Sequence, residues 1–181
     1  MKRRIGIVVG MVLLLPLALW AQDVKRDWDK TYDFSKWKTF AIKIGTSWGN
    51  QLSENRVLAE ITQGLTEKGW KKVASESEAD MIAVLHGATE VKHTLNTFYS
   101  GYGGYGYGGW GGAGMSTGTT TVSDYTVGTL VVDLFDAKTK KLTFRGTATD
   151  ELSDKVEKNA KKLEKASDKL FKDFPVPDKK K

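Results

Sequence analysis

The chain has 181 residues, with 28 Lys and Arg against 22 Asp and Glu, a formal net charge of +6 and no cysteine. The absence of thiols excludes disulfides, thiolate metal sites and a lipid anchor on a cysteine. No basic segment is interleaved with aromatic residues as a nucleic-acid platform requires, so we expect no nucleic-acid partner.

The first 21 residues have the order of a secretory signal peptide. A basic start at residues 1–4 precedes an apolar run at 5–19 and the small residue Ala21. We expect cleavage after Ala21, which leaves about 160 residues with a net charge of about +3 and no stable membrane insertion. The expected location is periplasmic or secreted. The alternative is an uncleaved N-terminal membrane anchor, because the run is near the lower limit of about 17 residues for a span.

Two strands and one helix are predicted early in the mature chain. The strands cover 23–28 and 37–44, and one face of the second carries Phe40, Ile42 and Ile44. We expect Ser53 to cap the helix and Gly69 to end it. Its buried stripe comprises Val57, Leu58, Ile61 and Leu65. Gly64 weakens this helix, and close packing against the sheet would explain it.

The next segments predict the middle of a sheet. A short strand at 70–74 and a polar turn at 75–78 precede residues 79–85, which are apolar on both faces as in a central strand. Beyond Gly87 the pattern alternates, so this arm should leave the protected centre. Residues 119–127 resume an exposed strand, and we expect Gly128 to be a β-bulge.

Residues 128–148 predict a β-hairpin that the rest of the chain covers. Its first arm has Leu130, Val132 and Leu134 on one face, and the face of the second arm comprises Leu142, Phe144, Gly146 and Ala148. A charged turn at 136–140 joins the arms. We interpret Asp133 as structural, either buried and hydrogen-bonded or at an exposed edge, because a lone carboxylate lacks an acid/base partner.

A second helix follows, with Ser153 as the expected cap. Its apolar stripe should face the sheet and comprises Val156, Ala160, Leu163, Ser167, Leu170 and Phe174. Residues 175–181 are expected to be a disordered basic tail. The whole pattern predicts a single α+β domain at 22–174, with one antiparallel sheet of about five or six strands and two helices packed on one face.

Residues 101–118 are rich in Gly and Tyr and predict a flexible loop between two long strands. Candidate partner-binding side chains in and beside it are aromatic and could stack on a glycan, peptide or protein: Tyr99, Tyr102, Tyr105, Tyr107 and Trp110. The alternative is a low-complexity insertion without a ligand. The G-x-G-x-x-G string at 104–109 lacks a following helix, so we expect no nucleotide cofactor.

The sharpest catalytic candidate is Ser47, because residues 45–49 match the G-x-S-x-G nucleophile elbow between a predicted strand and a predicted helix. A serine nucleophile needs a histidine oriented by a carboxylate. His86 and His93 are the two histidines, and we expect them on opposite faces of one strand, where neither completes a triad or a metal site. We therefore expect no catalytic residue and no metal or cofactor.

Five segments together carry a family resemblance: DFSKWKTFA at 33–41, KGW at 68–70, ADMI at 79–82, GTLVVDL at 128–134 and KLTFRG at 141–146. In this order they resemble the bacterial cell-envelope family called domain of unknown function 4136. The resemblance implies a small exported α+β domain, often lipid-anchored through a cysteine after the signal, without an established activity or catalytic residues. This chain has Ala21 and Gln22 where that cysteine would lie, which favours a soluble periplasmic form.

The expected function is that of an exported, non-catalytic cell-envelope protein that binds an envelope protein or a glycan. Two competing hypotheses remain. One is a serine hydrolase that uses Ser47, and the other is a structural or stress-related envelope component.

Overall fold

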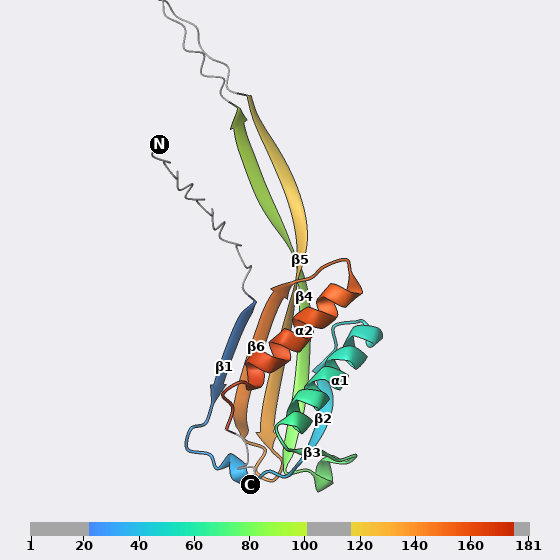
Figure 1. Ribbon diagram of the computed structural model, residues 1–181, viewed down its shortest axis with the longest axis vertical. Helices are drawn as coiled ribbons and strands as arrows, with labels where there is room; N and C mark the ends of the chain where they lie inside the picture. Colours follow the sequence, from blue (N-terminus) through green and yellow to red (C-terminus); the bar gives the residue numbers. More distant parts are fainter. Residues whose placement is uncertain (1–21, 101–116, 176–181) are drawn as a thin grey trace, which may run out of the picture.

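The computed structural model describes residues 22–100 and 117–175. Its elements in chain order are β1 (Asp23–Trp28), η1 (Phe34–Lys36), β2 (Thr39–Thr46), α1 (Gln51–Glu67), β3 (Lys71–Lys72), η2 (Glu76–Glu78), β4 (Met81–Ser100), β5 (Thr117–Asp136), β6 (Leu142–Glu151) and α2 (Val156–Phe171). The strands form one six-stranded sheet in the order β1-β6-β5-β4-β2-β3, and both helices lie in front of it in Figure 1. The α+β class and the number of strands are confirmed.

The sheet is mixed, so the prediction of a purely antiparallel sheet was wrong. β2 runs parallel to both β3 and β4, whereas the other neighbouring pairs are antiparallel. The physical reason is helix α1, which carries the chain from the end of β2 back to the end where β2 began. A strand that follows such a crossover runs in the same direction as the strand before it.

The apolar faces of the helices and the sheet form one core. Its most deeply buried members include Phe40, Ile61, Leu65, Leu85, Val132, Phe144, Leu170 and Phe171. α1 contacts β2 and β3, α2 contacts β1 and β6, and the helices contact each other. Gly64 lies at this helix contact rather than against the sheet, because a Cβ atom there would be 2.7 Å from Oγ of Ser167. The explanation expected for this glycine was therefore wrong.

Both helices begin away from the expected caps. Asn50 caps α1, since its side chain accepts a hydrogen bond of 3.1 Å from the backbone N–H of Ser53. Helix α2 begins at Val156, and Ser153 instead accepts from the backbone N–H of Lys155 before the helix starts. The predicted stripe of α2 holds only in its later part, because Val156 is 48% exposed and Ala160 is also exposed.

The bulge lies elsewhere in the sheet than expected. The pairing of β5 with β6 shifts between Leu134 and Phe135 and stays regular at Gly128. As a result Leu142 is 37% exposed, while Thr143 is buried and its hydroxyl donates to the carbonyl of Leu134 at 2.9 Å. The sequence pattern had placed Leu142 on the core face, because it assumed an unbroken alternation.

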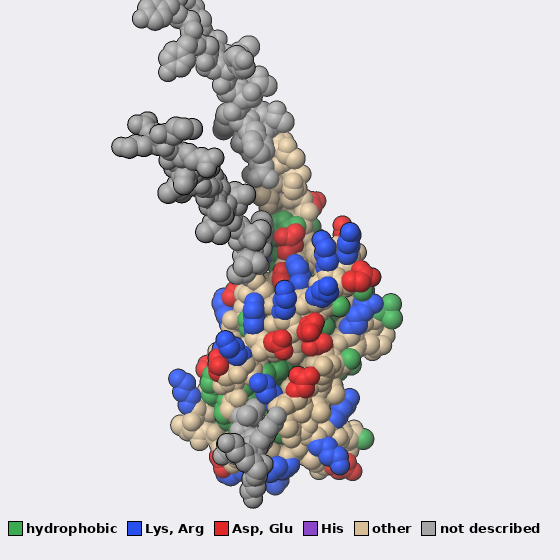
Figure 2. All heavy atoms as spheres, viewed as in Figure 1, with side chains coloured by type: hydrophobic (Ala, Val, Ile, Leu, Met, Phe, Trp, Pro, Cys, Tyr) green, Lys and Arg blue, Asp and Glu red, His purple; other side chains and the backbone are tan. Residues whose placement is uncertain are grey.

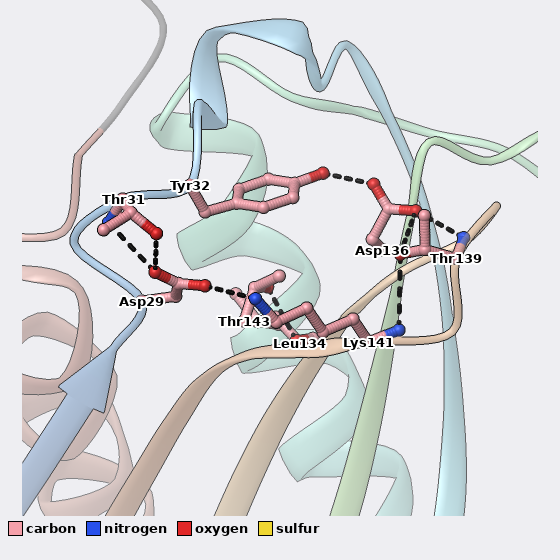
Figure 3. A network of polar contacts seen from close by, with 8 residues as sticks. All are labelled: Asp29, Thr31, Tyr32, Leu134, Asp136, Thr139, Lys141 and Thr143. Atoms are coloured by element: carbon pink, nitrogen blue, oxygen red, sulfur yellow. Dashed lines mark hydrogen bonds and ion pairs between the residues drawn. The ribbon is translucent and has the colours of Figure 1, made fainter.

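A polar network closes the end of the sheet where β1 meets the turn between β5 and β6 (Figure 3). The hydroxyl of Tyr32 donates to the carboxylate of Asp136, which also accepts from Thr139. Burial alone would raise the pKa of Asp136, but these hydrogen bonds outweigh it and lower the pKa to about 2. Nearby, Lys141 contacts Asp29 at 2.6 Å and holds the pKa of that carboxyl well below its usual range.

β4 and β5 are paired along their whole length, from Met81 with Asp136 to Ser100 with Thr117. β2 flanks β4 only as far as His86, and β6 flanks β5 only as far as Val127. Residues 91–100 and 117–126 therefore form a two-stranded ribbon with no third described strand, and Figure 1 shows it projecting beyond the helices. The expected emergence of this arm from the sheet is confirmed.

Candidate functional site

A cleft of about 580 Å³ lies between the N-terminal halves of α1 and α2, near the base of the ribbon. α1 contributes Arg56 and Val57 to one wall, and α2 contributes Asn159 and Leu163 to the other. The floor comes from β4, β5 and β6. Sequence reasoning did not find this cleft, because its walls come from segments about a hundred positions apart in the chain.

Two glycines of the floor leave room for side chains that line the cleft. The indole of Trp48 rests on Gly87, where a Cβ atom would lie 1.8 Å from Cε3 of the ring. Leu152 rests on Gly128 in the same way, with Cδ2 at 2.9 Å from the Cβ position. An isolated glycine within a strand often marks such a close approach. Gly87 and Gly128 could therefore have indicated from the sequence that another side chain packs on the strand at these positions.

The cleft also holds polar groups without a described partner. The side-chain oxygen Oε1 of Gln22 is buried and accepts no hydrogen bond from residues 22–100 or 117–175, while its Nε2 donates to the carbonyl of Lys162 at 2.8 Å. The hydroxyl of Ser53 and the guanidinium of Arg56 make no hydrogen bond or ion pair with residues 22–100 or 117–175. These groups can accept from and donate to a ligand.

Charges of both signs are interspersed over the helices in Figure 2. Acidic side chains gather where the helices face each other, and burial together with Glu164 and Asp168 raises the pKa of Glu60. Lys162, in the cleft wall, is engaged by Asp150 at 2.9 Å and by the carbonyl of Glu151 at 2.6 Å. Arg56 is therefore the cation of the cleft wall with no described partner.

The structure brings Ser47 to an acid rather than to a histidine. Its hydroxyl donates to Oε1 of Glu54 at 2.5 Å, and the same oxygen accepts from the backbone N–H of Trp48 at 3.2 Å. Glu54 is only 7% exposed and belongs to the first turn of α1. The G-x-S-x-G segment thus forms a turn that fastens the chain to the start of this helix.

The two histidines have separate partners. Nδ1 of His86 is 2.8 Å from the hydroxyl of Thr46, and its Nε2 is 3.8 Å from the carboxylate of Asp133. His93 pairs with Asp124 on the ribbon at 2.6 Å. Asp133 is buried, and two hydrogen bonds from a neighbouring strand reach it, which is one of the two environments expected for it.

The predicted aromatic contacts lie largely beyond the described residues. Tyr99 pairs with Gly118 through the backbone of the ribbon. Its side chain lies outside the described part of the structure, as do Tyr102, Tyr105, Tyr107 and Trp110. Residues 22–100 and 117–175 contain no cluster of three or more potential metal ligands. Nor does any helix within them have the length and apolar character needed to cross a membrane.

Comparisons with known proteins agree with the sequence resemblance. The family model described as domain of unknown function (DUF4136) matches residues 24–176. A crystal structure of a DUF4136 family protein from Bacteroides thetaiotaomicron VPI-5482 is 15% identical, with 83% of this chain and 94% of that chain covered and a TM-score of 0.54.

A PDZ domain protein from Parabacteroides distasonis ATCC 8503 has a similar fold at 13% identity and a TM-score of 0.54. The match covers 84% of this chain but only 35% of that protein. At these identities the two solved structures show a shared fold alone. No curated protein matches the sequence.

Proposed function

The chain belongs to the DUF4136 family, and we propose that it is an exported, non-catalytic cell-envelope protein that binds a partner in the cleft between α1 and α2. The cleft is the observation that carries the proposal. Ligand sites are concave and mostly apolar, with a few polar groups that fix the ligand's orientation. Trp48, Val57, Leu152 and Leu163 supply apolar surface here, and Gln22, Ser53 and Arg56 supply the polar groups.

A glycan fits this lining better than a protein segment does. A sugar ring combines one apolar face with several hydroxyls, so it can lie against an indole while it donates and accepts hydrogen bonds. Trp48 offers the ring, Oε1 of Gln22 offers an acceptor, and Arg56 offers donors. An envelope protein is the other class of partner.

The absence of catalysis is part of the proposal. It is supported by the hydrogen bond from the Ser47 hydroxyl to Glu54 and by the contact of His86 with Thr46 rather than with Ser47. Export is proposed from the signal-like residues 1–21. N-terminal sequencing of the protein from a periplasmic fraction should begin at Gln22 if Ala21 is the cleavage site.

The binding proposal can be tested by titrating the chain from residue 22 onward with peptidoglycan-derived oligosaccharides and following its amide and indole signals by NMR. We expect shifts at Trp48 and along the helix walls of the cleft, and affinity about tenfold weaker in Arg56→Ala. Lys72→Ala is the matched control, since Lys72 is exposed on β3, away from the cleft.

Saturable shifts confined to another surface would contradict the cleft as the site. If oligosaccharides do not bind but periplasmic crosslinking joins an envelope protein to cleft residues, the partner is a protein instead. Deletion of residues 101–118 removes four of the five aromatic candidates and leaves Tyr99. A partner that the removed residues contact should be lost or weakened while the cleft remains.

A further inference from the structure

We propose that the solvent-facing side of α2 binds a linear, carboxylate-bearing glycan through a row of lysines. This lysine row comprises Lys158, Lys165, Lys169 and Lys172. Successive members are seven, four and three positions apart, and each of these spacings returns to the same side of an α-helix. With a rise of about 1.5 Å per residue, the row is about 21 Å long.

The lysine row is a free surface, separate from the cleft. All four side chains are exposed, and none forms an ion pair with residues 22–100 or 117–175. None of them lines the cleft. Lys162 has the same spacing but belongs to the cleft wall, where Asp150 and the carbonyl of Glu151 engage it. Binding at the row therefore does not depend on a ligand in the cleft.

The stability of the fold does not explain the row. Like charges three or four positions apart on a helix repel each other, as Lys165 with Lys169 and Lys169 with Lys172 do. Lys158 lies in the first turn of α2, where the helix dipole disfavours a cation. Since no ion pair within the described residues compensates for this repulsion, a ligand that brings negative charges explains the row better.

The distribution of charge over α2 favours a narrow ligand. Acidic side chains occupy the adjoining strip of the helix: Glu157, Glu164 and Asp168. In Figure 2 blue side chains follow α2 on the side away from α1, and red side chains gather between the two helices. A flat anionic bilayer laid on the row would also meet the acidic strip, which would repel it. A single polymer chain can follow the row alone.

The side-chain type indicates how such a polymer would be held. A lysine is a compact charge on a flexible stem, so a row of lysines suits acidic groups that recur along a chain rather than bidentate recognition of one group. The row includes no aromatic ring on which a nucleic-acid base could stack. The choice of a glycan over a nucleic acid also rests on the proposed export, because an exported protein meets the polysaccharides of the envelope.

Titration with polygalacturonate at physiological ionic strength tests the proposal directly, with the chain from residue 22 onward. We expect the NMR signals of the row to shift and calorimetry to show binding that weakens as salt is added. The variant without the row should bind at least about tenfold more weakly. It carries Lys158→Gln, Lys165→Gln, Lys169→Gln and Lys172→Gln.

A matched control removes the same amount of charge from exposed lysines outside α2. It carries Lys30→Gln, Lys71→Gln, Lys72→Gln and Lys138→Gln. This control should bind within about threefold of the wild type, since the lost charges lie away from the row. Equal losses of affinity in the two variants would show that binding follows net charge alone and would overturn the proposal.

Thermal unfolding separates a binding role from a structural one. Loss of the row should leave the melting temperature unchanged or slightly raised, because repulsion between the lysines is relieved. A marked fall in melting temperature would show that the lysines stabilise the fold, and the proposal would then be wrong.

Ligand length and type test the linear geometry. A galacturonate trisaccharide should bind at least about tenfold more weakly than a chain of about ten sugars, since it covers only part of the row. Equal affinity for the two lengths would contradict a row of contacts. Stronger retention on phosphatidylglycerol vesicles than on polygalacturonate would assign the surface to a membrane instead. A wild-type chain that does not bind polygalacturonate would also overturn the proposal.

Discussion

Arg145 holds the buried carboxylate of Asp133 with two hydrogen bonds, from Nε at 2.7 Å and from Nη2 at 2.6 Å. The two residues face each other across β5 and β6. Their environments differ, because the side chain of Asp133 is 2% exposed whereas that of Arg145 is 57% exposed. The exposed guanidinium therefore satisfies a carboxylate that water cannot reach.

We expect Arg145→Met to lower the free energy of unfolding by about 1–3 kcal/mol, since it leaves Asp133 buried with a weaker set of partners. Urea denaturation measures this. Arg145→Lys should lose less, because it keeps the charge but not the two-pronged geometry. Lys25→Ala, which removes an exposed ion pair with Asp23, should change stability little. Equal losses in all three variants would contradict the role assigned to Arg145.

Acid should weaken the fold through Asp136. The pKa of this carboxyl is lowered from 3.8 to about 2, so the folded state favours the ionised form. Its stabilisation is present above about pH 4 and is lost as the pH falls toward 2. Asp136→Asn should lower the free energy of unfolding by about 1–2 kcal/mol at neutral pH. This is less than the pKa shift alone would give, because solvent screens the interactions of this carboxylate. It should also flatten the dependence of unfolding free energy on pH between 4 and 2.

Tyr32→Phe probes the same contact from the other partner. Removing its hydroxyl should move the pKa of Asp136 back toward the ordinary value, which NMR titration of the carboxyl would show. Burial and the contact with Asp136 raise the pKa of Tyr32 to about 12, so this tyrosine stabilises the fold below pH 10 and ceases to do so between pH 10 and 12. An unchanged titration of Asp136 in Tyr32→Phe would contradict the hydrogen bond.

Gly87→Ala should displace Trp48, because the new Cβ atom would lie within 1.8 Å of the ring. We expect a loss of about 1–3 kcal/mol in unfolding free energy and a change in Trp48 fluorescence. Gly128→Ala is the matched comparison, where the end of the flexible Leu152 side chain at 2.9 Å can move aside. If Gly128→Ala is the more damaging of the two, the proposed support of Trp48 by Gly87 is wrong.

Ser47 should not react with a fluorophosphonate probe, since its hydroxyl donates to Glu54. Ser47→Ala should instead cost about 0.5–1.5 kcal/mol of stability through the lost hydrogen bond. A known serine hydrolase in the same reaction controls for probe activity. Labelling of the wild type that disappears in Ser47→Ala would establish a nucleophile and overturn the non-catalytic proposal.

The sequence was sufficient for features that depend on local patterns. Alternation of apolar residues located β2 and the hairpin of β5 and β6, and the spacing of Ile61 and Leu65 located the core face of α1. The pairing of Asp133 with Arg145 could not be read from the hairpin in the same way. Equal distances from a turn at 136–140 would place Asp133 opposite Thr143, and the register shift between Leu134 and Phe135 changes the pair.

Features set by long-range geometry were missed. The strand, helix and strand order at 39–85 is typical of a parallel pair, yet an antiparallel sheet was expected. The bulge that exposes Leu142 and the approach of α2 to Gly64 depend on how separate elements meet. The cleft depends on the same meeting of separate elements, since Trp48 and Leu152 reach it only once the sheet is assembled.

β4 and β5 run without interruption from the middle of the sheet into the ribbon, so no hinge separates the two parts. A force along the ribbon would act parallel to the strands, so it would shear the hydrogen bonds between β4 and β2 and those between β5 and β6. In this geometry the bonds share the force, and many of them would have to break together. The ribbon is therefore a direct continuation of the central strands of the sheet. A force applied to the ribbon would be transmitted to the part of the sheet that the helices cover.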